Sequence, residues 1–496
     1  MKETKNPFLP DRVYIADGEP HVFGDRVYLF GSHDGEAADT YCALDYEFYS
    51  APIDDLSNWT SKGINYSSSQ DPLSLKTNRK YMYAPDCVRG NDGKYYLYYC
   101  LSGERGHGGY FGPISVARCD VPDGKYEFYG YVKNPDGTIH NENVCFDPAV
   151  MNDDGIIRLY YGTLYPFYGG RKNHKKHIES QINMFNKTYE QITSDNGVMG
   201  PFTTTLCDDM MTINSDVVRV LPVDRVKPPF DGHYSKKGRF GRHMYGTAFF
   251  EAASIRKFND LYYFIYSSLN GHELCYAYSK FPNKDFKYGG VIISNGDIGY
   301  KKRHQLDRLN ATGTNHGSVE CINGNYYVFY HRQTHGSDYS RLAMAEPINI
   351  LPDGSIPQVP MSSMSFYAKP LCEKGKYHAN LACNITNGHM PHGSNKIVGN
   401  IPCITSDEYN QYVKLFDYAY ANYKYFNLSN VESIAINLRG YGPLEVYVNN
   451  ILMDTINVNS KDFTCYKINI SGNDSSLLTF KALDNEIHIL SFELLC

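Results

Sequence analysis

The feature that most constrains the fold is a unit that recurs along the first 347 residues. In each unit a polar residue precedes a short apolar strand, a turn with Gly, Asn or Asp, and a strand rich in Tyr. The clearest example is 249–268 (FFEAASIRKFNDLYYFIYSS), which carries one acid, Glu251, and a turn at Asn259 and Asp260. These turn residues tolerate the positive φ that two-residue hairpins need, so each unit predicts a β-hairpin. The polar residues that open the units are Asp17, Asp86, Asp147, Glu251 and His316.

The spacing of the units predicts a propeller. In a propeller, four or more small antiparallel sheets repeat along the chain, and neighbouring sheets bury their faces against each other around a central channel. Successive opening residues stand 61 to 69 positions apart, except for a gap of 104 between Asp147 and Glu251. We expect an insertion in this gap, around 165–196, where QINMFNKTYEQI suits either a short helix or a loop. The five opening residues are expected to point towards one end of the axis.

Composition and the later sequence complete an all-β prediction. The chain of 496 residues has 45 Tyr and one Trp, and Tyr favours pleated, half-buried surfaces. The hairpin units predict a five-bladed β-propeller over 1–347, followed by a Pro-rich linker over 348–360. Short alternating runs then predict a β-sandwich over 361–496. These runs are YKYFNL, ESIAINL, LEVYVNN, TCYKINI, LLTFKAL and EIHILSFEL.

Several functional classes are disfavoured. A net charge of −6 offers no basic face for nucleic acid, and no run of about 18 apolar residues predicts a membrane span. The first residues lack the apolar core of a secretory signal, and 13 scattered Cys without a C-x-x-C pair argue against a zinc site or a disulfide framework. We therefore expect a cytoplasmic protein. Neither a phosphate-binding G-x-x-x-x-G-K-[ST] nor a G-x-S-x-G nucleophile motif occurs.

The acids that open the units are the better candidates for chemistry. Cleavage of a glycosidic bond needs one carboxylic acid that protonates the leaving oxygen and a carboxylate opposite it. A third carboxylate beside the acid would raise its pKa and keep it protonated near neutral pH. The sequence thus offers the right number of groups, although spacing alone assigns no roles. A simple turn-opening role, common for Asp before Pro, is the alternative at Asp147.

A resemblance to a known family suggests the roles. The segments YIADGEPHVFGDRVYLFGSHD, YAPD, FDPAV, FFEAASIRK and NHGSVE with YYVFYHR together resemble family 43 of the glycoside hydrolases, from about residue 6 to 347. That family is a five-bladed propeller that hydrolyses with inversion. The resemblance implies that Asp17 is the general base, Asp147 the pKa modulator and Glu251 the general acid. It also matches His316 to an axial histidine near which a calcium ion often lies, as a minor ligand among oxygens.

The sequence departs from the family in two places. The base is usually followed by Pro, whereas Gly18 and Glu19 intervene here, which makes Glu19 a rival base. The acid is usually followed by Gly-Pro and here by two alanines. Tyr83 stands where the family often has Trp. Together with His33, Asp34 and Arg332 it is predicted to line the sugar pocket, with hydrogen bonding between blades as the alternative for the last three.

The C-terminal region resembles the later half of a family 6 carbohydrate-binding module, through YKYFNL, INLRGYGPLEVYV and HILSFEL. Bracing the propeller, with a loop lent to the pocket, is an equal alternative to polymer binding. The family implies an exo-glycosidase acting on oligosaccharides that contain arabinose or xylose. We expect an α-L-arabinofuranosidase, with a β-D-xylosidase or a bifunctional enzyme as alternatives. Two rivals are a non-catalytic sugar-binding propeller and a retaining propeller hydrolase of fructans.

Overall fold

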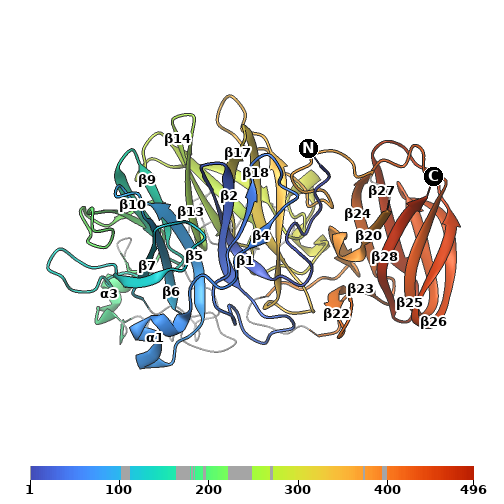
Figure 1. Cartoon of the computed structure of the whole chain (residues 1–496), viewed down its shortest axis with the longest axis horizontal. Coiled ribbons are helices and arrows are strands. Elements are labelled where there is room, and N and C mark those ends of the chain that lie inside the picture. The colour runs from blue at the N-terminus through green and yellow to red at the C-terminus, as the bar shows by residue number, and fades with distance from the viewer. Residues whose placement is uncertain are drawn as a thin grey trace.

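The chain folds into a ring of five small sheets and a separate C-terminal β-sandwich (Figure 1). The computed structural model describes residues 2–101, 112–163, 179, 182–183, 185–193, 197–221, 249–268, 272–372, 375–393 and 399–495. The blue to yellow sheets of the ring stand beside the orange and red sandwich, so the two parts follow each other along the chain. This architecture confirms the all-β prediction of a five-bladed propeller followed by a sandwich.

Each blade of the described chain is an antiparallel meander whose strands pair in sequence order. The first holds β1 (Ile15–Phe23), β2 (Arg26–His33), β3 (Tyr49–Pro52) and β4 (Thr60–Ser61), and the second β5 (Met82–Arg89), β6 (Tyr95–Leu101), β7 (Ser115–Cys119) and β8 (Glu127–Tyr131). The third holds β9 (Ala149–Asp153), β10 (Ile156–Tyr161), β11 (Phe202–Leu206) and β12 (Val218–Arg219). The fourth holds β13 (Phe249–Phe258), β14 (Leu261–Ser268), β15 (Leu274–Ser279) and β16 (Lys287–Ile293), and the fifth β17 (Ser318–Ile322), β18 (Asn325–Gln333) and β19 (Arg341–Ile348).

The hairpin of β13 and β14 forms as the sequence predicts. Phe258 pairs with Leu261, and Asn259 and Asp260 between them have φ of 50° and 65°. Two consecutive positive φ values are typical of a tight hairpin turn, which Asn and Asp tolerate. The inner strand buries Ala252 to Ile255 and the Tyr-rich strand buries Tyr262 to Ser268. Burial of both strands explains why the apolar run and the tyrosines recur in every unit.

Helices are short in the described residues. They are α1 (Pro72–Thr77), α3 (Tyr189–Thr193) and the 3-10 turns Ser68–Gln70, Tyr300–Lys302, Gln305–Asp307 and Ala379–Leu381. The insertion expected around 165–196 lies largely outside the described residues, but α3 forms at its end, where a short helix was one of two expectations. No described helix is long and apolar enough to cross a membrane.

The N-terminal segment closes the ring. Ala345 N in β19 donates to Asn6 Oδ1 at 3.0 Å, and Asn6 Nδ2 donates to Ala345 O at 2.8 Å. Asn6 is fully buried, and its backbone N–H donates to Ser363 O at 3.0 Å. Between blades one and five, Gly18 and Gly317 form a parallel bridge near the axis. The first and last blades are therefore joined at both the axis and the outer edge, which fixes the inner strands around the channel.

The C-terminal part forms one nine-stranded antiparallel sheet in the described residues, folded over a large apolar core. The long β25 (Ser433–Val448) pairs with β28 (Ile487–Leu495) at its start and with β27 (Ser476–Ala482) at its end. Gly440, with φ of 128°, is the last residue paired with β28, and Gly442, with φ of 129°, precedes the pairing with β27, so the strand changes partner at these glycines. The remaining strands are β20 (Gly375–His378), β21 (Asn384–Thr386), β22 (Cys403–Ser406), β23 (Gln411–Leu415), β24 (Tyr420–Phe426) and β26 (Ile451–Asn469).

Candidate active site

Irregular backbone at the start of the inner strands sets the direction of the carboxyl side chains of Asp17, Asp147 and Glu251. The ladder of β1 and β2 shifts register between Ala16 and Glu19, and that of β13 and β14 shifts on both sides of Glu251. Asp17, Asp147 and Ala252 have φ of 54°, 44° and 65°, the left-handed region that most residues avoid. Such bulges bend a strand and redirect its side chains, and they are common beside active sites.

Asp17 lies beside a buried arginine. Arg341 Nη1 donates to Asp17 Oδ1 at 2.7 Å, and both side chains are buried. Burial acts to raise the pKa of Asp17, but the charges of Arg341, His316 and His331 outweigh it and lower this pKa to about 2. Asp17 is therefore a carboxylate at neutral pH, as a general base must be.

Glu251 and Asp147 are held in the opposite state. Burial, and then the negative charge of Asp17, raises the pKa of Glu251 to about 8. Burial and the neighbouring Glu251 and Asp17 raise the pKa of Asp147 well above its usual value, although Ala252 N donates to Asp147 Oδ2 at 3.0 Å. Glu251 keeps a partly exposed side chain in this setting. One cluster thus holds a protonated, partly exposed Glu251, which is able to donate a proton, and an ionised Asp17, which is able to accept one.

His316 lies between the two aspartates. Its Nδ1 is 3.8 Å from Asp17 Oδ1 and 3.7 Å from Asp147 Oδ2. Burial lowers the pKa of His316 to about 4, so the ring is neutral near pH 7. His331 Nδ1 accepts a hydrogen bond from Asp17 N at 3.1 Å and supports the bulge from the other side. His331 is a neighbour of Asp17 that the sequence reasoning did not single out.

Two of the predicted polar residues lie deeper in the channel. Glu19 Oε2 accepts from Arg256 Nη2 at 2.8 Å and from Ser254 Oγ at 3.1 Å. Asp86 Oδ1 lies 2.6 Å from His21 Nε2, and ligand atoms of Glu19, His21 and Asp86 all lie within 4.8 Å of one another. The expectation that all five opening residues point to one end is therefore wrong for Asp86. In its blade Ala84 takes the left-handed position, with φ of 36°, and moves Asp86 to the level of Glu19.

The deeper location of Glu19 also bears on the choice of base. Burial raises the pKa of Glu19 to about 8 in spite of Arg256, whereas the pKa of Asp17 is lowered to about 2. A base must be ionised before it can take a proton, so these opposite shifts favour Asp17 over Glu19. The role of either residue stays a prediction.

The surroundings of His316 fit a calcium ion poorly. An ion on its Nδ1 side would touch Asp17, whose pKa is lowered, and Asp147, whose pKa is raised, and would disturb both. Deeper in the channel, Glu19 and Asp86 offer the oxygens that calcium prefers. There the Arg256 guanidinium already supplies positive charge, 2.8 Å from Glu19 and 3.6 Å from Glu320. A second cation at this level would be repelled, and the role of His316 as a calcium ligand stays a prediction.

The four residues predicted to line the pocket separate into two groups. Asp34 accepts two hydrogen bonds from the Arg341 side chain, at 2.7 Å to Nε and 3.0 Å to Nη2, so it orients the partner of Asp17. His33 Nδ1 donates to Asp45 O at 2.9 Å and remains partly exposed. Tyr83 is buried, with its ring 6.3 Å from that of Tyr41. Asp34 therefore lies next to Arg341, and Tyr83 lies near it through Tyr41.

Arg332 lies elsewhere. Its guanidinium donates to Ala382 O and, at 3.1 Å, to Asn310 Oδ1, both at the boundary with the C-terminal sandwich. A cavity of about 20 Å³ beside it is lined by Asn295 and Met390 among others, enough for about one water molecule. These contacts favour the alternative of a structural role, and sugar binding by Arg332 stays a prediction.

Besides His331, sequence reasoning missed three further residues of the cluster, Arg341, Tyr41 and Tyr339. Arg341 begins β19, the last strand of its blade, and not one of the inner hairpin strands from which the candidate residues were predicted. Tyr41 lies with its ring 5.0 Å from the Arg341 guanidinium and 4.7 Å from the ring of Tyr339. Flat aromatic faces of this kind suit a sugar ring. The signal for Arg341 was a charged residue that directly precedes the apolar run LAMA at the head of the strand RLAMAEPI.

The comparisons with known proteins agree with this geometry. The family model for glycosyl hydrolases family 43 matches residues 4–214. A xylosidase/arabinosidase of Thermoclostridium stercorarium is 40% identical over 462 residues, which cover 90% of this chain and 88% of that protein. Two solved structures share the fold. One is a GH43_1 enzyme from Xanthomonas citri complexed with xylotriose, with a TM-score of 0.52, 22% identity and coverage of 74% and 97% of the two chains. The other is a family 43 arabinoxylan arabinofuranohydrolase from Bacillus subtilis in complex with cellotetraose, with a TM-score of 0.50, 18% identity and coverage of 99% and 97%.

Proposed function

This chain belongs to family 43 of the glycosyl hydrolases, and we propose that it is an inverting exo-glycosidase releasing terminal α-L-arabinofuranosyl residues from arabinoxylan- or arabinan-derived oligosaccharides. The observation that carries the proposal is the opposite shift of two pKa values in one cluster. The pKa of Asp17 is lowered to about 2 and that of Glu251 is raised to about 8. Hydrolysis of a glycoside needs such a pair of an ionised and a protonated carboxyl group.

In the proposed reaction, Asp17 removes a proton from a water molecule that attacks the anomeric carbon. The bond from that carbon to the leaving oxygen breaks, and Glu251 gives its proton to this oxygen. Because the water attacks the face opposite the leaving group, the configuration inverts. Burial and the charge of Asp17 keep Glu251 protonated, and Asp147 orients it by accepting a hydrogen bond from Ala252 N, the next residue in the chain. Arg341 keeps Asp17 ionised.

A β-D-xylosidase, or an enzyme with both activities, is the second candidate. It is favoured by the relative at 40% identity, whose name pairs xylosidase with arabinosidase. Terminal arabinofuranose and xylopyranose present similar hydroxyl patterns to a pocket, so one constellation of Asp34, Tyr83 and His33 could hold either. We propose arabinofuranose as the preferred sugar. Measured kcat/KM for nitrophenyl α-L-arabinofuranoside and nitrophenyl β-D-xyloside ranks the two activities directly.

A non-catalytic sugar-binding propeller is the rival of another class. It would need neither the raised pKa of Glu251 nor the lowered pKa of Asp17, and both shifts cost stability or require a buried partner. The substitutions Glu251→Gln and Asp17→Asn distinguish a glycosidase from a non-catalytic sugar-binding protein. We expect each to lower turnover by about 10³-fold or more with the fold retained. Turnover close to that of the unsubstituted protein in either variant would refute the assignment.

The stereochemistry separates inversion from the retaining chemistry of a fructan-type hydrolase. Proton NMR of the first sugar released should show the anomer opposite to that of the substrate. Retained configuration would exclude Asp17 as a base acting on water and would make it a nucleophile instead. We also propose a cytoplasmic location, which is supported by the burial of seven of the described cysteines as ordinary core residues.

A further inference from the structure

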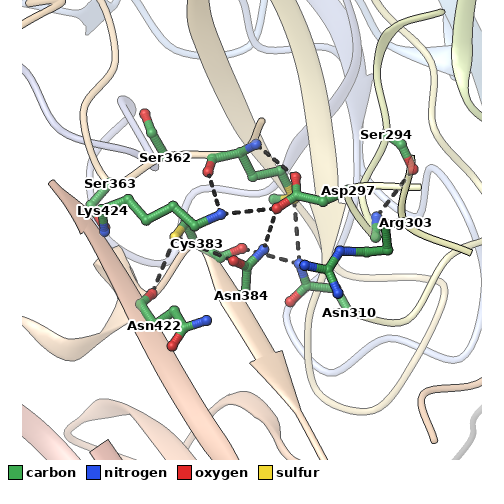
Figure 2. Close-up of polar contacts among 12 residues, drawn as sticks. Ser294, Asp297, Arg303, Asn310, Ser362, Ser363, Cys383, Asn384, Asn422 and Lys424 are labelled. Atoms are coloured by element: carbon green, nitrogen blue, oxygen red, sulfur yellow. Dashed lines mark hydrogen bonds and ion pairs between the residues drawn. The ribbon is translucent and has the colours of Figure 1, made fainter. Parts of the chain in front are cut away.

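A buried polar network fastens the C-terminal sandwich to the propeller (Figure 2). Asp297, which follows β16, accepts from Lys424 Nζ of β24 at 2.9 Å and from Asn384 Nδ2 of β21 at 3.2 Å. Met361 N donates to the other oxygen, Asp297 Oδ1, at 2.8 Å. Asp297 is only 2% exposed, so its charge depends on these partners from the sandwich side. Segments that lead from this interface are thus held in fixed positions against the propeller.

One such segment, 391–393, pairs with the chain just before His316. Thr312 N donates to Pro391 O at 3.2 Å, and Gly393 N donates to Thr312 O at 3.1 Å. The Thr312 hydroxyl also lies 3.0 Å from His392 Nδ1. At Gly313, with φ of 142°, an added Cβ would lie 1.7 Å from Gly393 O, so the two backbones touch. Thr312 stands four positions before His316, and the sandwich therefore braces the segment that carries this histidine.

His392 also contacts the blade that carries the acid. Its ring lies 5.8 Å from that of His272, and His272 lies 4.8 Å from the ring of Phe250, the neighbour of Glu251. On the same blade Ser267, which pairs with Glu251 across the ladder, donates to Asn315 O. Glu251 is therefore linked to the segment 312–316 through Ser267 and Asn315. It is linked to His392 through Phe250 and His272. His392 thus lies two ring contacts away from Phe250, the neighbour of Glu251.

Buried polar atoms on this side lack protein partners. His272 Nδ1 and both amide atoms of Asn315 make no hydrogen bond within the described part of the chain. His272 is 7% exposed and Asn315 2% exposed. Buried polar groups in folded proteins nearly always have partners, so each exception needs an explanation. Sugar hydroxyls both donate and accept, and they match a histidine nitrogen and a carboxamide equally well.

We propose that His392, His272 and Asn315 form the wall of the subsite that holds the leaving sugar, so that the C-terminal sandwich completes the active site. The inference rests on the proposed function, in which Glu251 protonates the oxygen of the leaving group. That oxygen must lie beside Glu251, and the next sugar then lies against the residues that surround this acid. The sandwich serves here as a part of the catalytic pocket through His392, whose role is to bind the substrate.

The test compares a substrate that has a leaving sugar with one that has none. kcat/KM is measured for His392→Ala on an arabinoxylo-oligosaccharide and on nitrophenyl α-L-arabinofuranoside. His389→Ala is the matched control, because His389 belongs to the same loop and is exposed. We expect a loss of about tenfold or more on the oligosaccharide, since the site loses a hydrogen-bonding partner of the substrate. On the nitrophenyl substrate the change should stay within about twofold, and His389→Ala should match the unsubstituted enzyme on both.

A second variant, His392→Gln, guards against loss of fold, and thermal unfolding is recorded for every variant. Equal losses on both substrates would mean that His392 only braces His316, and would overturn the proposal. Unchanged activity on both substrates would overturn it as well. If the unsubstituted enzyme cleaves neither substrate, the proposed function itself fails, which is a distinct result.

Discussion

Arg341 Nη1 lies 2.7 Å from Asp17 Oδ1, although the two residues are 324 positions apart in the chain. The contact exists because the fifth blade lies beside the first once the ring has closed. Arg341 also binds Asp34 through two nitrogens, so its guanidinium is held in one orientation. A rigid, planar cation is suited to this double task, since lysine offers only a point charge on a flexible stem. Closure of the ring thus sets the ionisation of the predicted base.

The first prediction concerns this pair. Arg341→Lys should lower kcat/KM by about 100-fold, because the ammonium group cannot hold Asp34 and Asp17 together. It should also raise the pKa of Asp17 and move the acid limb of the pH–activity profile to higher pH. Arg332→Lys is the control: it should lower the unfolding temperature through the interface and leave the profile in place. An unmoved acid limb in Arg341→Lys would contradict the role given to Arg341.

The second prediction concerns the alkaline limb. Glu251 must be protonated to act, and its pKa is raised to about 8. Activity should therefore fall as the pH rises through about 8, while Asp17, with a pKa of about 2, leaves the enzyme active far into the acid range. The measurement is kcat/KM against pH on a nitrophenyl glycoside. Constant activity up to pH 10 would show that another group donates the proton.

The third prediction concerns stability. In the unfolded chain a glutamate loses its proton near pH 4.5, whereas folded Glu251 keeps it until about pH 8. Between these values the unfolded state binds fewer protons than the folded state, so this residue lowers stability as the pH rises. Glu251→Gln removes that dependence. We expect the variant to gain in unfolding temperature over the unsubstituted protein between pH 5 and pH 8, by calorimetry. A gain that is constant or shrinks over this range would contradict the raised pKa.

The fourth prediction concerns the interface in Figure 2. Asp297→Ala leaves Lys424 without its carboxylate, and breaking a buried pair costs about 3–5 kcal/mol of unfolding free energy. The control is Lys62→Ala, which removes a surface pair of similar length, 2.9 Å to Asp123, and should cost less than about 1 kcal/mol. Denaturant unfolding gives both values. Equal costs would mean that the interface contributes no more than an ordinary surface contact.

The fifth prediction concerns calcium. Because the Arg256 guanidinium already places a positive charge beside Glu19 and Glu320, we expect EDTA to leave activity and unfolding temperature unchanged. Added calcium should likewise have no effect on either. A rise of several degrees on adding calcium, reversed by EDTA, would instead support the metal predicted beside His316.

Local chemistry made part of this fold predictable. The turn at Asn259 and Asp260 forms because these residues accept positive φ, and the alternation of Tyr and apolar residues is a property of strands buried on both faces. The grouping of Asp17, Asp147 and Glu251 followed because each stands at the start of an inner strand. Such features depend on neighbours in sequence, which the chain itself displays.

The remainder depends on geometry that no short segment contains. In the second blade Ala84 takes the left-handed conformation that Asp17 has in the first blade, so Asp86 corresponds to Glu19 and not to Asp17. Nothing in the segment YAPD reveals which residue takes this conformation. Arg341 reaches Asp17 only across the closed ring. Arg332 and Arg341 stand nine positions apart at facing ends of β18 and β19, yet one meets the sandwich and the other the acids. The direction of each side chain at the end of its strand determines which of the two arginines contacts Asp17.

Closure of the ring by Asn6 has a consequence for synthesis on the ribosome. Its carboxamide bonds to Ala345 and its backbone N–H to Ser363, so these partners leave the ribosome 339 and 357 residues after Asn6 itself. Throughout that interval the first blade lacks its final neighbour, and the N-terminal segment waits without its partner strand. Nascent chains should therefore stay sensitive to proteases until the fifth blade emerges, and a bulky N-terminal fusion would interfere at the last step of assembly.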